Sequence, residues 1–300
     1  MRKAKMAVAL LSAVGMALCL AGCRVSNHAG GLSDISYADS EQYTPGAAEL
    51  SETVERIDIH WPVGSVTVKP HGGNTVFLSE ESAMELTEDA RLRYWLDGTT
   101  LHIQLCQEGK WRLDEMEKDL TVLVPEGLML AEVVVNSLSA EIRLDGLQAN
   151  RLTVDTTSGD MRLTGCAVTE LFSTGTVSGS LEAELAQPLE EFSGDSTSGS
   201  FQISAPAIEN FSSGSVSGSV SLSVEEAPKT LDIHTTSGNI DLVLPADAAF
   251  TLDYDATSGE LSSDLPYTTE GGRYIFGDGT GEYVISTVSG NVRITAPNKK

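Results

Sequence analysis

Cysteine is scarce in this chain, and its few positions exclude several kinds of site. Four cysteines occur among 300 residues, and two of them, Cys19 and Cys23, lie in or beside an apolar N-terminal segment. No Cys-x-x-Cys pair and no zinc-ligand spacing is present, which argues against a zinc or redox centre. Cys106 and Cys166 remain. They are either a disulfide formed in an oxidising compartment or two buried thiols, and the sequence leaves both interpretations open.

Basic residues and catalytic motifs are also in short supply. The 19 Lys and Arg stand against 43 Asp and Glu, for a formal net charge of −24. Such a surface repels nucleic acid and anionic headgroups and favours cations and basic partners, although a solvated acidic exterior is the simpler interpretation. The chain has no P-loop, dinucleotide fingerprint, nucleophile elbow or His-Glu-x-x-His motif. We therefore expect no cofactor, no resident metal and no nucleic-acid partner.

Only one apolar run is long, and it lies at the N-terminus. Residues 6–20 are almost entirely apolar, follow a positively charged start and precede Leu20-Ala21-Gly22-Cys23. This layout predicts a signal peptide over residues 1–22. Its ending resembles a bacterial lipobox, which implies cleavage before Cys23 and acyl chains such as palmitate on that residue. We expect a lipoprotein held in the lipid bilayer by acylated Cys23, at the extracytoplasmic face of a bacterial cell membrane.

Two segments precede the repetitive part of the chain. Residues 23–50 are mostly small and polar, which predicts a flexible tether between membrane and domain. Residues 51–130 contain short apolar strands separated by turns, and Asp97-Gly98 between two of them is a strong hairpin signal. We expect this less regular β region to cap one end of the fold, because repeat arrays need their terminal edges covered.

A Ser-Gly dipeptide then returns at nearly constant spacing. Successive copies are 20, 20, 19, 20, 21 and 31 residues apart, and a degenerate copy, Ser139-Ala140, lies 19 residues before the first. A fixed period of this length is the signature of a solenoid, in which each unit buries its apolar face against the next. The seven copies are Ser158-Gly159, Ser178-Gly179, Ser198-Gly199, Ser217-Gly218, Ser237-Gly238, Ser258-Gly259 and Ser289-Gly290.

Apolar residues form columns when the repeats are aligned on the Ser. They stand six and four positions before it and three and five positions after it, with polar residues between them. This is the period-two alternation of strands with one buried face. Because the inward offsets change from even to odd at the dipeptide, the chain turns a corner there. We expect the Gly to adopt a positive φ, and the Ser to face inward or line the corner, where its hydroxyl bonds a backbone group.

Stacking equivalent strands above one another requires a parallel ladder. The sequence therefore predicts an all-β fold, a parallel β-helix or β-solenoid of about eight coils of ~20 residues over residues 131–296. Phe172, Phe192 and Phe211 then stack inside the core. An antiparallel sandwich of hairpins is the competing fold, but it would not place equivalent residues of successive repeats above one another. The 31-residue step contains an insertion at 264–282, expected to form a hairpin or lid, and residues 297–300 form a short tail.

The segments Thr156-Thr157-Ser158-Gly159-Asp160 and Thr235-Thr236-Ser237-Gly238-Asn239 resemble a bacterial family. It is a domain-of-unknown-function family whose members are described as candidate adhesins with β-strand repeats. The strand-Pro elements that end at Pro125 and Pro245, and the Gly-rich segment before Ser289, match it as well. The resemblance covers about residues 53–296. It implies a β-helix-like fold in secreted or membrane-attached proteins, sometimes linked to envelope stress, and no established catalytic residues.

Three functions are compatible with the sequence. The first is a non-catalytic, adhesin-like module that binds an envelope or host protein or glycan along its side. The second is a regulatory or scaffolding lipoprotein of the envelope stress response. The third is a polysaccharide lyase or hydrolase, by analogy with other β-helices. Such an enzyme needs clustered carboxylates. The best candidate is a surface cluster of Asp232, His234, Asp253 and Asp255, on coils expected to be neighbours, although solvated strand residues explain it more simply. We favour the first function.

Overall fold

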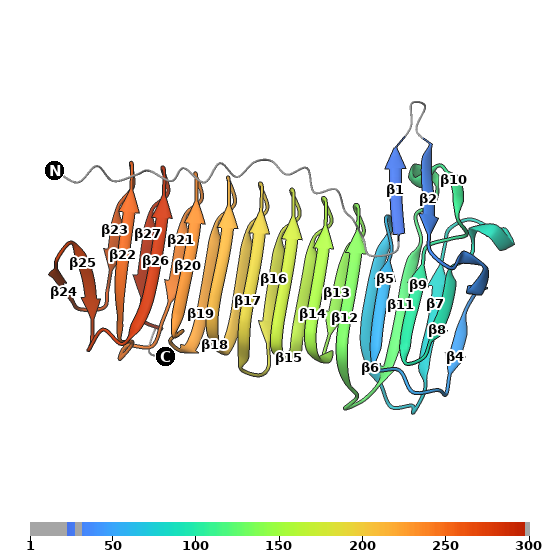
Figure 1. The fold of residues 1–300 in the computed structure, drawn as a ribbon, viewed down its shortest axis with the longest axis horizontal. Coiled ribbons are helices and arrows are strands. Elements are labelled where there is room, and N and C mark those ends of the chain that lie inside the picture. Colours follow the sequence, from blue (N-terminus) through green and yellow to red (C-terminus); the bar gives the residue numbers. More distant parts are fainter. Residues whose placement is uncertain (1–22, 28–31, 298–300) are drawn as a thin grey trace.

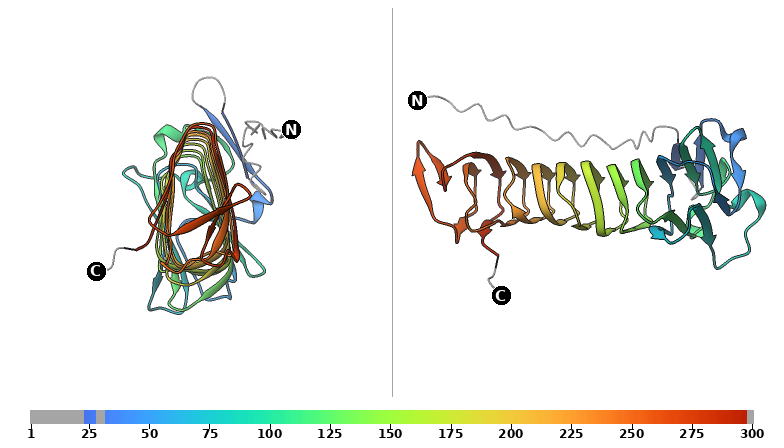
Figure 2. Two further views of the ribbon diagram at one scale, coloured as in Figure 1. Left: turned by 90° about the vertical axis from the view of Figure 1, so that its left-hand side faces the viewer. Right: turned by 90° about the horizontal axis from the view of Figure 1, so that it is seen from below.

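The computed structural model describes residues 23–27 and 32–297, which form a long rod of stacked β coils (Figure 1). Equivalent strands of successive repeats pair in parallel and in register, as in Leu152 beside Phe172 and Phe172 beside Phe192. The predicted parallel β-solenoid is thereby confirmed. The end-on view of Figure 2 shows the coils superimposed as a flattened ring. Among the described residues, no helix is long and apolar enough to cross a membrane.

Two long sheets form the broad walls of the rod. The first sheet contains the strands that precede each corner. From the N-terminal end of the rod its order is β3 (Thr44–Pro45), β8 (Arg93–Asp97), β9 (Thr100–Gln104), β5 (Arg56–His60), β12 (Met129–Ser137), β14 (Gln148–Thr156), β15 (Met161–Thr176), β17 (Leu189–Ser196), β18 (Phe201–Ser215), β20 (Thr230–Thr235), β26 (Gly281–Thr287), β22 (Phe250–Ala256), β25 (Arg273–Phe276) and β24 (Tyr267–Glu270).

The second sheet contains the strands that follow each corner. Its order is β4 (Ala48–Leu50), β7 (Val76–Glu81), β11 (Asp119–Pro125), β6 (Ser65–His71), β13 (Glu141–Asp145), the first part of β15, β16 (Leu181–Leu185), the first part of β18, β19 (Val220–Glu226), β21 (Ile240–Val243), β27 (Val292–Thr295) and β23 (Leu261–Ser263). A small sheet of β1 (Cys23–Asn27), β2 (Ser33–Tyr37) and β10 (Gly109–Trp111) and the short 3-10 helices η1 (Ser40–Gln42), η2 (Glu88–Ala90) and η3 (Leu113–Glu115) complete the N-terminal end.

The core lies between the two walls and consists of the predicted columns. Phe172, Phe192 and Phe211 are buried one above another. The ring centroid of Phe192 lies 5.3 Å from that of Phe172 and 4.9 Å from that of Phe211. The interpretation of these rings as core packing is confirmed. Burying a phenylalanine side chain contributes roughly 1.5–3 kcal/mol, so this internal stack is a substantial part of the stability of the middle coils.

The corner glycines serve close packing, and the expected left-handed backbone is wrong. Among the seven, only Gly259 in the end coil has a positive φ. A Cβ added to Gly179 would instead overlap the carbonyl oxygen of Gly159 in the preceding coil, and the same overlap recurs at each corner along the rod. The backbones of neighbouring coils therefore approach too closely at the corner to admit a side chain.

A column of buried hydroxyls stands behind the glycines, and the sequence columns did not include it. Thr176 Oγ1 accepts the N–H of Gly179 at 2.9 Å, and Ser215 Oγ accepts that of Gly218 at 2.7 Å. A buried N–H without an acceptor costs about 1–3 kcal/mol, so this hydroxyl stabilises the turn. The column consists of Ser137, Thr156, Thr176, Ser196, Ser215, Thr235 and Thr287.

The coils do not stack in sequence order at either end of the rod. At the C-terminal end, β26 pairs with β20 on one side and with β22 on the other, and β27 likewise lies between β21 and β23. The last coil in sequence is therefore inserted before the previous one. At the N-terminal end, β5 and β6 lie between β9 and β11 on one side and β12 and β13 on the other. The coil of β5 and β6 and the coil of β26 and β27 are thus each flanked by another coil on both sides.

The segments expected to be a tether and an irregular cap are more ordered than predicted. Ile35 and Tyr37 of β2 are buried, and Tyr37 Oη donates a hydrogen bond to the Cys106 carbonyl at 3.1 Å. The alternation of these two apolar residues gives β2 a buried face, so residues 33–50 pack on the domain and are not a flexible tether. Within residues 51–130, the parallel strands β5, β6, β9 and β11 extend the solenoid by two more coils.

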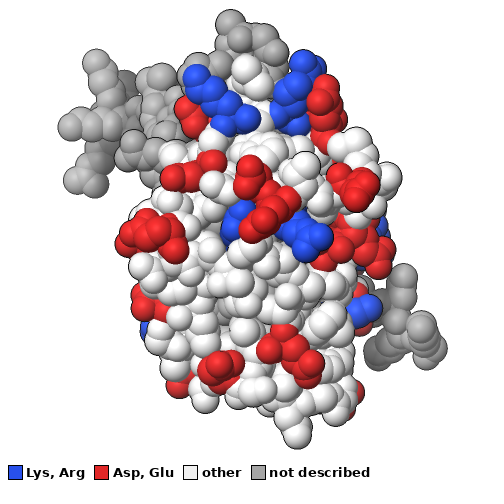
Figure 3. All heavy atoms as spheres, turned by 90° about the vertical axis from the view of Figure 1, so that its right-hand side faces the viewer, with Lys and Arg blue, Asp and Glu red and all other residues white. Residues whose placement is uncertain are grey.

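A buried lysine fastens the N-terminal end. Lys118 Nζ donates hydrogen bonds to Glu80 Oε2 at 2.6 Å and to the carbonyls of Ala90 and Leu105 at 2.6 and 2.5 Å. It also lies 5.1 Å from the ring centroid of Trp61. Figure 3 views this end of the rod, where Lys and Arg lie interspersed with Asp and Glu. The end is therefore closed by specific polar contacts beneath a surface of mixed charge.

Replacing a corner glycine tests the packing account. Gly179→Ala places a methyl group against the Gly159 carbonyl, and we expect it to lower the free energy of unfolding by about 1–3 kcal/mol. Gly72→Ala is the matched control, because a Cβ there has nothing within 4 Å. Urea denaturation followed by circular dichroism measures both. Equal stability of the two variants would contradict the close approach of the coils.

Candidate functional site

The outward side of the second sheet carries a ladder that ties each coil to the next. The Ser180 N–H donates to Asp160 Oδ1 at 2.9 Å, and the Ser219 N–H to Ser200 Oγ at 3.1 Å. We call this the outer ladder. Each member stands two residues after a corner Ser. In spatial order along the rod the members are Asp160, Ser180, Ser200, Ser219, Asn239, Asn291 and Glu260. Sequence reasoning missed its role, although the uniform presence of hydrogen-bond acceptors at that offset was the signal.

The corner serines face solvent. Ser158 and Ser178 are exposed, whereas a position facing inward or lining the corner was expected. The bonding part of the expectation holds at several corners, because Ser158 Oγ donates to the Leu138 carbonyl of the preceding coil at 3.2 Å, and Ser289 Oγ to the Thr236 carbonyl at 3.3 Å. The dipeptide is therefore a structural corner in which Ser lies at the outer edge and Gly is buried, except at Gly259 in the end coil.

The candidate cluster of Asp232, His234, Asp253 and Asp255 does not assemble. Asp232 and His234 lie on β20, with Asp232 Oδ1 2.7 Å from His234 Nε2. Asp253 and Asp255 lie on β22, and the coil that contains β26 separates the two strands. The expectation of neighbouring coils is wrong because the last coil is inserted between them. The two pairs are two coil spacings apart, roughly 10 Å.

Two aspartates on the outer face of the first sheet have perturbed acidity. Asp155 is half-buried and stands beside Gly175 of the next coil, and Asp195 stands in the same way beside Gly214. Burial raises the pKa of both carboxyls, and a hydrogen bond to the Gly175 backbone opposes this effect at Asp155. A side chain on Gly214 would overlap Asp195 Oδ1, so the glycine leaves room for the carboxylate to lie over the next coil.

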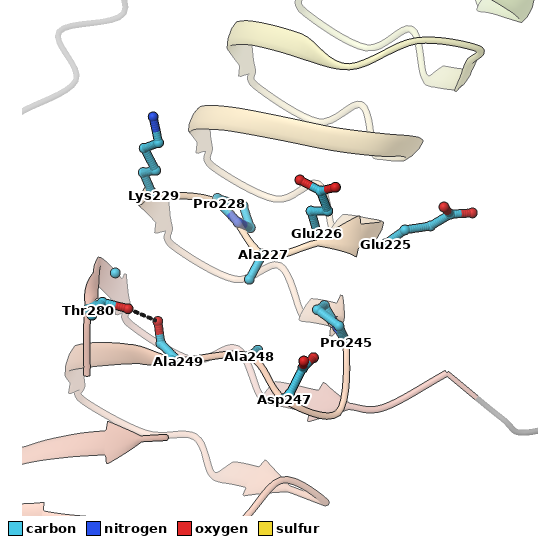
Figure 4. A pocket seen from close by; sticks show the side chains of 11 residues that line it. Glu225, Glu226, Ala227, Pro228, Lys229, Pro245, Asp247, Ala248, Ala249 and Thr280 are labelled. Carbon is cyan, nitrogen blue, oxygen red and sulfur yellow. Dashed lines mark hydrogen bonds between the residues drawn. The ribbon is translucent and has the colours of Figure 1, made fainter. Parts of the chain in front are cut away.

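A groove opens where the chain skips one coil. It has a volume of about 500 Å³ and lies between residues 225–229, which lead into β20, and residues 245–249, which lead into β22 (Figure 4). Thr280 and Gly281, at the start of the inserted β26, line it as well. Residues 245–249 pass the level of the inserted coil as they lead to β22, and a gap is left beside that coil. Glu225, Glu226 and Asp247 line it together with Lys229, so acidic side chains outnumber basic ones in the groove (Figure 4).

A His-Asp-His group at the N-terminal end was not found from the sequence, because its members are far apart in the chain. Asp58 Oδ1 lies 3.1 Å from His60 Nε2, and Asp58 Oδ2 lies 3.1 Å from His102 Nδ1. Trp95 stacks on His102, with ring centroids 5.5 Å apart. Among residues 23–27 and 32–297, no three His, Cys, Asp or Glu side chains are arranged to hold a metal ion.

Cys106 and Cys166 are two separate buried thiols with no disulfide between them. Cys166 Sγ lies 3.1 Å from the Leu144 carbonyl. Burial raises the pKa of the Cys166 thiol to about 11, so the thiolate is rare at neutral pH. Of the two interpretations that the sequence left open, the structure therefore supports the buried thiols.

The fold and its outer faces define a parallel β-solenoid of Ser-Gly coils. The family model named Toastrack DUF4097 matches residues 54–295, and the chain belongs to that family. The resemblance expected from the repeats is thereby confirmed. No curated protein matches the chain.

Three solved structures are similar to it. A candidate cell adhesion protein from Clostridium sporogenes is 12% identical, with 84% of this chain and 100% of that chain covered and a TM-score of 0.27. A candidate adhesin from Bacteroides fragilis is 13% identical, with coverage of 83% and 95% and a TM-score of 0.47. A candidate lipid-binding protein from Parabacteroides distasonis is 14% identical, with coverage of 83% and 96% and a TM-score of 0.48.

The acidity of Asp58 predicts a pH dependence of stability. Burial disfavours its charged form, but hydrogen bonds from His102 and His60 and their charges outweigh this and lower its pKa from 3.8 to about 2. A lowered pKa in the folded state stabilises the fold above the unfolded pKa, and this contribution is lost as pH falls from about 4 to about 2. Replacing Asp58 with Asn should cost about 2 kcal/mol at pH 6.

Urea unfolding of wild-type protein and Asp58→Asn at pH 6 and at pH 2.5 measures this difference. The gap between the two proteins should shrink at the lower pH. A gap that is the same at both pH values would show that Asp58 acts through shape and not through its charge.

Proposed function

We propose that the protein is a lipid-anchored, extracytoplasmic and non-catalytic binding module that holds a partner along the side of its rod. The observation that carries this proposal is a continuous face of short hydroxyl and amide side chains on the second sheet, which we call the serine face. It consists of Ser200, Gln202, Ser204, Ser219, Ser221 and Ser223 of β18, β19 and the turns before them.

Register makes the serine face regular. Gln202 lies beside Ser221, and Ser204 beside Ser223, in neighbouring parallel strands. Polar side chains therefore repeat at the strand spacing of about 4.8 Å. Ser200 Oγ accepts a hydrogen bond from the next coil, which leaves its hydroxyl hydrogen for an acceptor on a ligand. Such a face suits a glycan or an extended peptide that offers polar groups at regular intervals.

The surrounding charge favours a neutral or basic partner. Between residues 131 and 296 the chain has six Lys and Arg against 24 Asp and Glu. Glu182 and Glu184 of β16 and Asp241 of β21 stand at equivalent outward positions beside the serine face. An anionic polymer would be repelled along the whole rod. We therefore propose a protein or glycan of the bacterial envelope, or of a host, as the partner.

The anchor belongs beside the N-terminal end of the rod. Cys23 opens β1, and β1 pairs with β2, whose Ile35 and Tyr37 are packed on the domain. An acylated Cys23 would hold this end at the membrane, while β24 and β25 lie at the opposite end of the rod (Figure 1). This arrangement supports a module that presents its long side to partners.

Removing the lipidated residue tests the anchor. Cys23→Ala should move the protein from the membrane pellet to the soluble fraction after cell fractionation, because the acyl chains supply the membrane affinity. Mass spectrometry of the wild-type N-terminal peptide should show Cys23 carrying acyl chains. An unmodified Cys23 in that peptide would refute the anchor.

A bulky charge on the serine face tests the binding surface. Ser221→Arg should weaken binding to the partner found on an envelope glycan array or in an envelope extract by about tenfold or more, since it blocks a tightly spaced face. Ser193→Arg, on the first sheet, is the matched control and should bind like wild type. Equal binding by both variants, or no partner on either screen, would overturn the proposal.

A further inference from the structure

The two ends of the solenoid are finished differently. At the N-terminal end, antiparallel strands cover both sheets, β8 along β9 and β7 along β11, and core residues such as Leu78 and Leu101 are 0% exposed. At the C-terminal end, only the Phe250–Leu252 part of β22 is covered by β25. Within the described part of the chain, β22 from Asp253 onward pairs only with β26, and β23 pairs only with β27. One side of the end coil is therefore an open strand edge, beside the β24–β25 hairpin (Figure 2).

The end coil also leaves part of the core uncovered. Its inward positions Tyr254, Ala256, Leu261 and Ser263 are half-buried, and its corner Gly259 is exposed. The equivalent residues of the neighbouring inserted coil are all buried, namely Ile285, Thr287, Val292, Ile294 and Gly290. The loss of burial is confined to the coil that lacks a successor. Another strand at this level would restore the burial that every other coil has.

Backbone groups along β23 are available for such a strand. The Val292 N–H donates to the Glu260 carbonyl, and the Asp264 N–H to the Ile294 carbonyl, so residues 260 and 264 direct these groups to β27. Along a parallel strand, the backbone N–H and C=O groups of successive residues point alternately to one neighbouring strand and to the other. Leu261 and Ser263 therefore direct their N–H and C=O groups to the open edge.

The outer ladder points to the same missing strand. In each coil before the end, the ladder side chain accepts an N–H from the next coil, and the last such bond joins the Glu260 N–H to Asn291 Oδ1 at 3.0 Å. Glu260 is the final member, and no N–H of the described residues donates to its carboxylate. Tyr254 Oη, which is buried, also has no hydrogen-bond partner among the described residues. Two polar groups near this edge thus have no hydrogen-bond partner among the residues that the structure describes.

The charge at the edge selects the occupant. Asp253, Asp255, Glu260 and Asp264 are exposed around it, and among the described residues two basic side chains lie near these four carboxylates: Arg273, 3.7 Å from Asp253, and Arg293, beside Ser262 on β27. A second copy would bring the same carboxylates face to face, which is destabilising. We infer that the open edge of β22 and β23 binds an extended segment of a partner protein with alternating apolar and basic residues, which adds to the solenoid as one further strand. The inference rests on the proposed role as a binding module and gives that module a second site at its tip.

A synthetic peptide of alternating lysine and valine, with blocked ends and a fluorescent label, is the probe. Fluorescence anisotropy with the purified full chain should show binding, and a glutamate–valine peptide should not bind. Glu260→Lys combined with Asp264→Lys should weaken the lysine–valine peptide by about tenfold or more. Glu182→Lys combined with Glu184→Lys, with the same change of charge on the side of the rod, should change binding less than about twofold.

Amide hydrogen exchange locates the peptide. Binding should slow exchange at Leu261 and Ser263, whose N–H groups face the open edge. The inference is overturned if these amides gain no protection, if both pairs of lysine variants weaken binding equally, or if sedimentation shows that the edge is occupied by a second copy. The proposed function would survive any of these results, because its test depends on Ser221 and on partners of the serine face.

Discussion

Backbone-to-backbone contact at the corners is the constraint on which the rest of the structure depends. At each corner along the rod the glycine lies against the carbonyl of the corner below it, so closely that no side chain fits. Only a residue without a side chain lets the coils keep the strand spacing of about 4.8 Å through the corner. The same turn brings the hydroxyl of Thr176 within reach of the Gly179 N–H. With the coil height fixed, the phenylalanine stack inside and the outer ladder outside follow at one common spacing.

The same contact explains how the ends of the rod are built. Gly290 lies on Gly238, and Gly259 lies on Gly290, so the corners follow spatial order and not sequence order. The insertion of residues 264–282 carries the chain out to the tip and lets the last coil return into the vacant level. Inserting the final coil pairs both edges of β26 and β27 with neighbouring strands. It also leaves the groove at residues 225–229 and an end coil with an open edge.

Much of this architecture can be predicted from the residues, for physical reasons that can be named. Columns such as Phe172, Phe192 and Phe211 reveal parallel stacking because burial repeats at fixed offsets. The order of the last two coils cannot be read in this way, since Asp232, Asp253 and Val284 occupy equivalent positions whichever coil comes first. The role of the glycines was misjudged because a positive φ and a close approach both select Gly. Ile35 and Tyr37 were overlooked in a segment dominated by small polar residues.

Engineered disulfides test the central claim, that the corners stack in the order 238, 290 and 259. Asp232 and Val284 are direct neighbours on adjacent strands, whereas Asp232 and Asp253 are two coils apart. A disulfide requires Cα atoms within about 7 Å. After oxidation, non-reducing mass spectrometry should find a 232–284 disulfide in Asp232→Cys/Val284→Cys and none in Asp232→Cys/Asp253→Cys. A disulfide in the second variant and none in the first would contradict the inserted coil and the corner order that it depends on.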